Sequence, residues 1–385
     1  MKSIYLDYAA ATPMDRRVFT AMQSYFTDDF YNPSATYLAG RAVRQTIAEA
    51  RASVAGWLGS QPGEIVFTAG ATEANNLAIS GIMRHFPDGE VLVSAIEHES
   101  VLAAAGQYKC RKIPVNRQGI VDLIELEKMI GPKTVLVSVM LVNNELGSVQ
   151  PLREIVKILN KLSILRKQSG NKLPLYLHSD AAQAPCFLDL HVSRLGVDLL
   201  SLNGGKIYGA KQSGVLYARS GVNLQPLVLG GGQENGRRSG TENVAAIVGL
   251  ARALELAQTA RHEETSRLND LRNLFTVGLA NLSPKIVING PAKQRTPHIV
   301  HATFPGWDNE RLMMQLDEAG MQVAVGSACS ASSQEPSHVL KAIGLSDKLA
   351  RSSLRFSLGR QTTKAQLQKS LQILESILQP TDSQL

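Results

Sequence analysis

Short runs of aliphatic and β-branched residues alternate with longer helical patterns through the first two-thirds of this 385-residue chain. This alternation predicts an α/β fold with a mostly parallel sheet and helices on both faces, because parallel strands are usually connected through a helix. The expected strands are residues 64–68, 90–95, 134–140, 173–180, 197–202 and 213–218, and the expected helices are 71–85, 151–167 and 241–264.

The pattern changes near residue 257. A long polar helix, expected to end near residue 282, leads into two strand-like segments, another helix and a final strand–helix pair. The change predicts a second, smaller α+β domain. We therefore expect an N-terminal segment (1–15) that packs with the small domain, a large domain (16–256) and a small domain (257–385).

Charge and cysteine content argue against several classes of protein. The 40 basic and 33 acidic residues are spread along the chain, and no run resembles a nucleic-acid or membrane-binding patch. No apolar segment is long enough to span a membrane, and the N-terminus does not resemble a signal peptide. The three cysteines are too few and scattered for a disulfide framework or a C-x-x-C metal site, which fits a cytoplasmic protein.

The loops after the expected strands carry polar residues where ligands bind in open α/β sheets. The loop after 64–68 opens a helix at Thr72, and free N–H groups there suit an anion. His98 follows the next strand, and Asn143 and Asn144 follow the strand 134–140. Taken singly, each has a structural alternative: a helix cap, a structural histidine and turn-forming asparagines.

Three further residues follow later strands. Asp180 ends a strand and is expected to be partly buried, so its carboxylate requires a cation or strong donor unless it caps a helix. Gln183 lies three residues further on. Lys206 lies in SLNGGKIYGAK, which is not a P-loop because Leu200 and Ile207 stand where glycine and Ser or Thr are required.

A glycine-rich loop, residues 230–243, carries Thr241 just before a helix. Together the loops offer an amine, a carboxylate, amides, an imidazole and two helix starts. This set suits pyridoxal 5'-phosphate (PLP), which requires a Schiff-base lysine, a carboxylate at its ring nitrogen and helix N-termini at its phosphate.

The chain resembles the PLP-dependent cysteine desulfurases, the NifS/IscS-like group I of the class V aminotransferases. The motifs that carry the resemblance run in order from residue 4 to about 370 and read YLDYAAATP, FTAGATEANN, EHES, NNELGSVQP, DAAQ, GGKIYGAK, GGGQENGRRSGTEN, GSACSAS and LRFSLGR. The resemblance implies PLP-dependent transferase fold type I, a homodimer, and conversion of L-cysteine to L-alanine. The sulfur would pass to an acceptor or scaffold protein for iron–sulfur cluster assembly or tRNA thiolation.

The resemblance also implies roles for individual residues. Lys206 would carry PLP and remove the Cα proton, Asp180 would pair with the ring nitrogen, and His98 would stack on the ring and transfer protons. Arg355 and Asn32 would hold the substrate carboxylate. The remaining PLP contacts would come from the Ala71 N–H and Thr72 at the phosphate, Thr241 from a second subunit, and Asn144 and Gln183 at the ring hydroxyl oxygen.

Cys329 distinguishes this reaction from other PLP chemistries. It lies in VGSACSASSQEPS, whose small polar residues are unsuited to a core, so we expect an exposed loop with a nucleophilic thiol. The resemblance implies that Cys329 takes the substrate sulfur as a persulfide. Cys110 and Cys186, in more apolar surroundings, fit the usual buried role.

The chain departs from the family pattern next to the lysine. The family has S-x-H-K, where Ser and His bond the PLP phosphate, whereas this chain has Asn203, Gly204 and Gly205 before Lys206. Losing such a bond costs on the order of 1.5–3 kcal/mol. We therefore expect PLP to bind more loosely, with Asn203 compensating in part. Tyr37 also stands where the family has His.

Three alternatives remain open at this stage: a selenocysteine lyase on the same fold, a transaminase that does not use Cys329, and a non-catalytic paralogue that binds partners. A metal enzyme is disfavoured, because the chain has no H-E-x-x-H motif. His298 and His301, three apart on an expected strand, would point to opposite faces.

Overall fold

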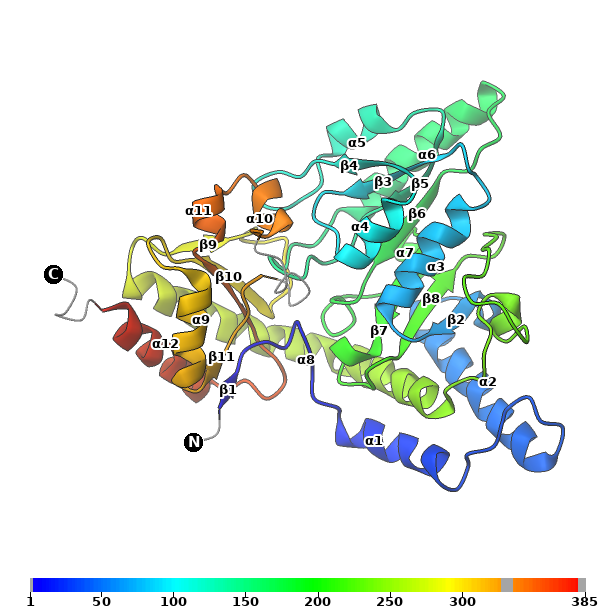
Figure 1. The fold of residues 1–385 in the computed structure, drawn as a ribbon, viewed down its shortest axis with the longest axis horizontal. Helices are drawn as coiled ribbons and strands as arrows, with labels where there is room; N and C mark the ends of the chain where they lie inside the picture. Colours follow the sequence, from blue (N-terminus) through cyan, green and yellow to red (C-terminus); the bar gives the residue numbers. More distant parts are fainter. Residues whose placement is uncertain (1–2, 327–334, 380–385) are drawn as a thin grey trace.

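The computed structural model describes residues 3–326 and 335–379 (Figure 1). Its larger half is built on a seven-stranded sheet of order β2-β8-β7-β6-β5-β3-β4. Neighbouring strands are parallel except that β8 is antiparallel to both β7 and β2. The predicted mostly parallel sheet is therefore confirmed. The strands are β2 (Ile65–Thr68), β3 (Glu90–Ser94), β4 (Lys109–Ile113), β5 (Thr134–Ser138), β6 (Tyr176–Asp180), β7 (Leu199–Asn203) and β8 (Gly214–Ala218).

Helices cover both faces of this sheet because apolar side chains alternate between them along each strand. Phe67 and Leu200 face a core formed with α2, α6 and the first half of α8, whereas Val66 and Leu199 face a core formed with α3 and α4. The helices of this half are α1 (Arg16–Met22), α2 (Leu38–Leu58), α3 (Ala71–Met83), α4 (Glu99–Ala105), α5 (Leu123–Met129), α6 (Leu152–Gln168), α7 (Val192–Leu195) and α8 (Val244–Leu282).

A second core lies at the far end of α8 (Figure 1). It combines an antiparallel sheet of order β12-β10-β9 with α9, α12 and the second half of α8. Strand β1 pairs in parallel with β11, and Ile4 and Leu6 are buried in this core. The elements are β1 (Ile4–Tyr5), β9 (Val287–Asn289), β10 (Ile299–Thr303), β11 (Met321–Gln322), β12 (Ser353–Ser357), α9 (Asn309–Glu318), α10 (His338–Ala342), α11 (Asp347–Ala350) and α12 (Lys364–Leu378).

The two cores share a single continuous helix. The expected boundary at residue 257 falls inside α8, which merges the expected helix 241–264 with the polar helix that follows. The start of α10 contacts loops of the larger half, because the Ser337 hydroxyl donates to the buried Glu145 carboxylate (2.6 Å) and His338 Nε2 lies 2.9 Å from the Glu97 carbonyl. The division into domains therefore stays a prediction.

No helix in residues 3–326 and 335–379 has the length and apolar character to cross a membrane. The same residues contain no group of three or more His, Cys, Asp or Glu side chains that could hold a metal ion.

Candidate active site

The loops after β2, β3, β5, β6 and β7 meet at one edge of the sheet, because these strands all run in the same direction. A cavity of about 170 Å³ lies at this edge. Most of the predicted site residues line it: Ala71, Thr72, His98, Asn144, Asp180, Gln183, Asn203, Lys206 and Arg355.

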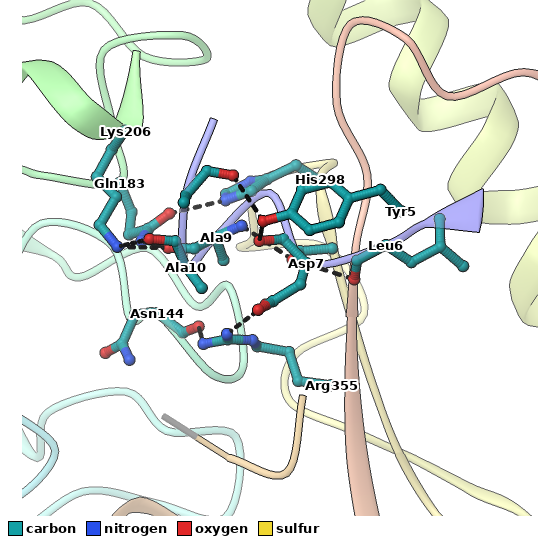
Figure 2. A network of polar contacts seen from close by, with 12 residues as sticks. Tyr5, Leu6, Asp7, Ala9, Ala10, Asn144, Gln183, Lys206, His298 and Arg355 are labelled. Carbon is teal, nitrogen blue, oxygen red and sulfur yellow. Dashed lines mark hydrogen bonds and ion pairs between the residues drawn. The ribbon is translucent and has the colours of Figure 1, made fainter. Parts of the chain in front are cut away.

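Lys206 ends a 3-10 turn, Gly204–Lys206, directly after β7. Its amine donates to the carbonyls of Ala9 (2.8 Å) and Ala10 (2.6 Å), as Figure 2 shows. The N-terminal segment therefore lies against the lysine and holds its amine at the cavity.

The two glycines before Lys206 differ in what surrounds them. A Cβ at Gly204 would overlap the Ser213 hydroxyl, whereas a Cβ at Gly205 would make only ordinary contacts with Asn203 and Lys211. The Asn203 side-chain oxygen accepts from the Gly205 N–H (3.0 Å), so it caps this turn. The Asn203 amide N–H groups remain the part of that side chain that could donate to an anion.

Asp180, at the end of β6, is 6% exposed. One carboxylate oxygen accepts from Asn75 Nδ2 (2.7 Å) and the other from the Ala182 N–H (2.8 Å). Asn75 Nδ2 also lies 2.9 Å from the Ser100 hydroxyl. These donors hold the carboxylate in one plane at the cavity.

His98 is the N-cap residue of α4. Its Nδ1 accepts from the Ser100 N–H (3.1 Å), so the neutral ring carries its proton on Nε2. This contact is the structural role expected of a histidine at that position, and it also sets the plane of the ring beside the cavity.

The N-terminus of α3 is uncapped by any side chain. Gly70 is the N-cap residue, with φ of 135°, and the helix begins at Ala71. The N–H groups of the first turn, including those of Ala71 and Thr72, are therefore available to an anion at the cavity.

Arg355, in β12, is 1% exposed, and its neighbours accept hydrogen bonds from only part of its guanidinium group (Figure 2). Nη2 donates to the Asp7 carboxylate (2.7 Å) and Nη1 to the Asn144 carbonyl (2.9 Å). Nε is buried without a hydrogen-bond partner in the described structure. A carboxylate entering the cavity could therefore pair with a cation that is already held in position.

A buried acid joins two of the loops. Glu97 accepts from the Ser94 hydroxyl (2.5 Å) and from the Met140 N–H (2.7 Å). Burial raises the pKa of Glu97 to about 8, although both hydrogen bonds oppose the shift, and the charge of Asp180 adds to it. Its contacts fix the loop after β3, which carries His98, against the loop after β5.

Two predicted site residues of the described chain, Asn32 and Thr241, are not brought to this cavity. Asn32 is exposed, and its side chain accepts from the Ser34 N–H in a local turn. Thr241 lines a separate cavity with Gln212 and Arg238. Cys329 lies outside the described residues. The predicted roles of these three residues therefore stay predictions.

The other two cysteines occupy the expected kinds of site. Cys186 is buried, and burial raises the pKa of its thiol to about 11. Cys110 is half-buried in β4 at the edge of the sheet. Neither thiol has the lowered pKa that marks a nucleophile.

Several residues that shape the site were not predicted from the sequence. Asp7, Ala9 and Ala10 contact the predicted functional side chains, yet they lie in YLDYAAATP, which follows no strand of the main sheet. Asn75 could have been identified, because it lies three and four residues after Thr72 and Ala71 and so shares their face of α3.

The chain is similar to known proteins over nearly its full length. Residues 4–369 match the aminotransferase class-V family. The chain is 39% identical over 385 residues to "Cysteine desulfurase IscS" of Dictyoglomus turgidum, covering 98% of this chain and 95% of that protein. It is 40% identical over 382 residues to "Cysteine desulfurase IscS 1" of Archaeoglobus fulgidus, covering 97% of each.

Solved structures show the same fold. A NifS-like protein superposes with a TM-score of 0.89 at 32% identity, covering 98% of this chain and 99% of that one. A structure described as SspA in complex with cysteine gives a TM-score of 0.80 at 34% identity, covering 92% and 99%. The chain therefore has the PLP-dependent transferase fold type I and belongs to the aminotransferase class-V family, among the cysteine desulfurases of the NifS/IscS-like group.

Proposed function

We propose that this protein is a PLP-dependent cysteine desulfurase that converts L-cysteine to L-alanine and passes the sulfur to Cys329 as a persulfide. The observation that carries the proposal is the single cavity where Lys206, Asp180, His98 and Arg355 meet. The proposal is also supported by the relatives named cysteine desulfurase and by the similar SspA structure with cysteine.

The residues around the cavity fit PLP. Lys206 would bond its aldehyde carbon, Asp180 would face its ring nitrogen, and His98 would lie against its ring. The uncapped start of α3 would receive the phosphate, and Asn144 and Gln183 would face the ring hydroxyl oxygen. When bound, PLP withdraws electrons from the Cα of an amino acid attached to it.

The side chains then have distinct tasks in the reaction. Arg355 holds the substrate carboxylate, with Asn32 predicted to assist. The Lys206 amine, placed by the Ala9 and Ala10 carbonyls, takes the Cα proton. The Cys329 thiolate attacks the substrate sulfur, so that the carbon–sulfur bond breaks, a sulfur–sulfur bond forms, and the carbon product takes up protons and leaves as alanine. His98 would transfer protons in these steps.

The two glycines before Lys206 lead to a prediction about PLP affinity. Gly205→His is expected to lower the PLP dissociation constant about tenfold or more, because it restores a donor to the phosphate at a position where an added Cβ meets only ordinary contacts. Titration of apoprotein with PLP, followed by absorbance, measures the change. Gly205→Ala is the matched control and should leave the constant near that of the wild type. An unchanged constant in Gly205→His would refute the expectation.

A homodimer is also part of the proposal. The stretch from α1 to the start of α2 exposes Phe19, Phe26, Phe30, Tyr37 and Leu38, with Phe26 63% and Leu38 83% exposed. Apolar side chains gathered in this way mark interaction surfaces. A second copy covering them would also supply Thr241, which lies outside the cavity of its own chain.

Light scattering tests the dimer. The wild type should have twice the mass of one chain, and a Phe30→Asp, Leu38→Asp variant should be monomeric and bind PLP more weakly. A matched double substitution on the exposed face of α6, Ile164→Asp with Leu165→Asp, should stay dimeric. A wild-type protein with the mass of one chain would contradict this part of the proposal.

Alanine formation from L-cysteine with added PLP and a thiol reductant tests the activity itself. Competition between L-cysteine and L-selenocysteine separates a desulfurase from a selenocysteine lyase, and full activity without Cys329 would favour a transaminase. The sulfur acceptor, in iron–sulfur cluster assembly or tRNA thiolation, is expected to be a protein, and a cytoplasmic location stays a prediction.

A further inference from the structure

A chain of hydrogen bonds runs behind the candidate site from His298 to the lysine (Figure 2). His298 Nε2 lies 3.1 Å from Gln183 Oε1, and Gln183 Nε2 donates to the Ala9 carbonyl (2.9 Å). The same carbonyl accepts from the Lys206 amine (2.8 Å). Because a carbonyl oxygen can only accept, Gln183 must turn its amide nitrogen toward Ala9 and its oxygen toward His298. His298 Nε2 must therefore carry the proton and donate.

The surroundings of His298 keep its ring neutral and fixed. It precedes β10, is 3% exposed and stacks on Phe187 with ring centres 4.3 Å apart and planes at 17°. Burial lowers the pKa of His298 to about 3, and the charges of Arg355 and Arg295 add to the shift. Its Nδ1 is buried without a partner in the described structure, so Nε2 provides the ring's polar contact.

Packing alone does not fix the Gln183 amide. A small cavity of about 20 Å³, lined by Gln183, Lys206 and His298 among others, leaves space beside it. The Ala9 carbonyl engages one of the two amide hydrogens. The other is available to the main cavity, which Gln183 also lines.

We propose that His298 is a positioning residue for the cofactor, acting through Gln183: it holds the amide so that an N–H faces the ring hydroxyl oxygen of PLP. This inference rests on the proposed function, in which Gln183 contacts that oxygen. Without the His298 donor, only the Ala9 contact opposes rotation of the amide. A rotated amide presents its own oxygen, which repels an ionised ring oxygen. A merely structural His298 would fill space against Phe187 and leave the cofactor unaffected.

The test uses the visible absorption band of PLP bound to the whole protein. An N–H bonded to the ring oxygen favours its ionised form, so losing that bond raises the pH midpoint at which the band changes. His298→Phe keeps an aromatic ring beside Phe187 but removes the donor. It is expected to raise the midpoint by about half a pH unit to one unit. His298→Gln, which places an amide nitrogen near the position of Nε2, should return the midpoint close to that of the wild type.

Gln183→Ala separates this inference from the proposed function. It should raise the midpoint at least as far as His298→Phe, and adding His298→Phe to it should have no further effect. If Gln183→Ala shifts the midpoint and His298→Phe does not, the inference is wrong and the role of Gln183 stands. If neither variant shifts it, the proposed contact between Gln183 and PLP is wrong as well. Thermal unfolding shows whether each variant is folded. If His298→Phe does not fold, His298→Leu is a second variant that lacks the donor.

Discussion

Replacing Lys206 by alanine is expected to lower the rate of alanine formation from L-cysteine by roughly a thousandfold or more, since it removes both the covalent link to PLP and the proton acceptor. The visible band of protein-bound PLP should be lost or shifted at the same time. Both effects follow from the position of the amine in the cavity, where the Ala9 and Ala10 carbonyls hold it.

Lys211→Ala is the matched control, because Lys211 is exposed five residues further along the same loop. This variant should keep its activity and its absorption band. Comparable alanine formation by wild type and Lys206→Ala, with PLP in excess, would show that Lys206 is not the Schiff-base lysine.

Arg355→Lys is expected to raise the KM for L-cysteine about 10- to 100-fold, with a smaller effect on kcat. The change removes the planar guanidinium that binds a carboxylate through two hydrogen bonds, so substrate binding is weakened more than the chemical step. A lysine still offers a cation to Asp7, which the wild-type side chain contacts at 2.7 Å. Removing the cation altogether would leave the Asp7 carboxylate without its partner and weaken the fold, so Arg355→Ala is the poorer test.

Steady-state kinetics give KM and kcat for L-cysteine in Arg355→Lys and in a matched control, Arg351→Lys. Arg351 is exposed four residues earlier in the chain, and its substitution should change neither constant. A KM that stays at the wild-type value in Arg355→Lys would mean that another group holds the substrate carboxylate.

Much of the main sheet could be predicted because its strands are buried on both faces. Strands β3, β5 and β8 are buried along their whole length, have apolar centres and end at polar loops. Both the strands and the site at their carboxyl ends were therefore predictable. The edge strand β4 was missed because it reads KCRKI, in which most side chains face solvent and the apolar pattern is absent.

Other features depended on contacts between distant segments. Helix α2 was missed although its buried Val43, Ile47, Val54 and Leu58 repeat at helical spacing, a signal that could have identified it. The contacts of Asp7 with Arg355 and of Ala9 with Lys206 join residues about 350 and 200 positions apart, and no local pattern encodes them. The link from His298 to Gln183 is of the same kind, because it joins the two halves of the molecule.

The measurement that tests the central claim most directly is alanine formation from L-cysteine, with excess PLP and a thiol reductant, by wild type, Cys329→Ala and Cys110→Ala. The account predicts that the wild type forms alanine and that Cys329→Ala forms at least about a hundredfold less. Cys110→Ala should be as active as the wild type, because the Cys110 thiol is half-buried at the edge of the sheet. No alanine from the wild type would contradict the account and point to a protein that keeps the desulfurase fold without its reaction.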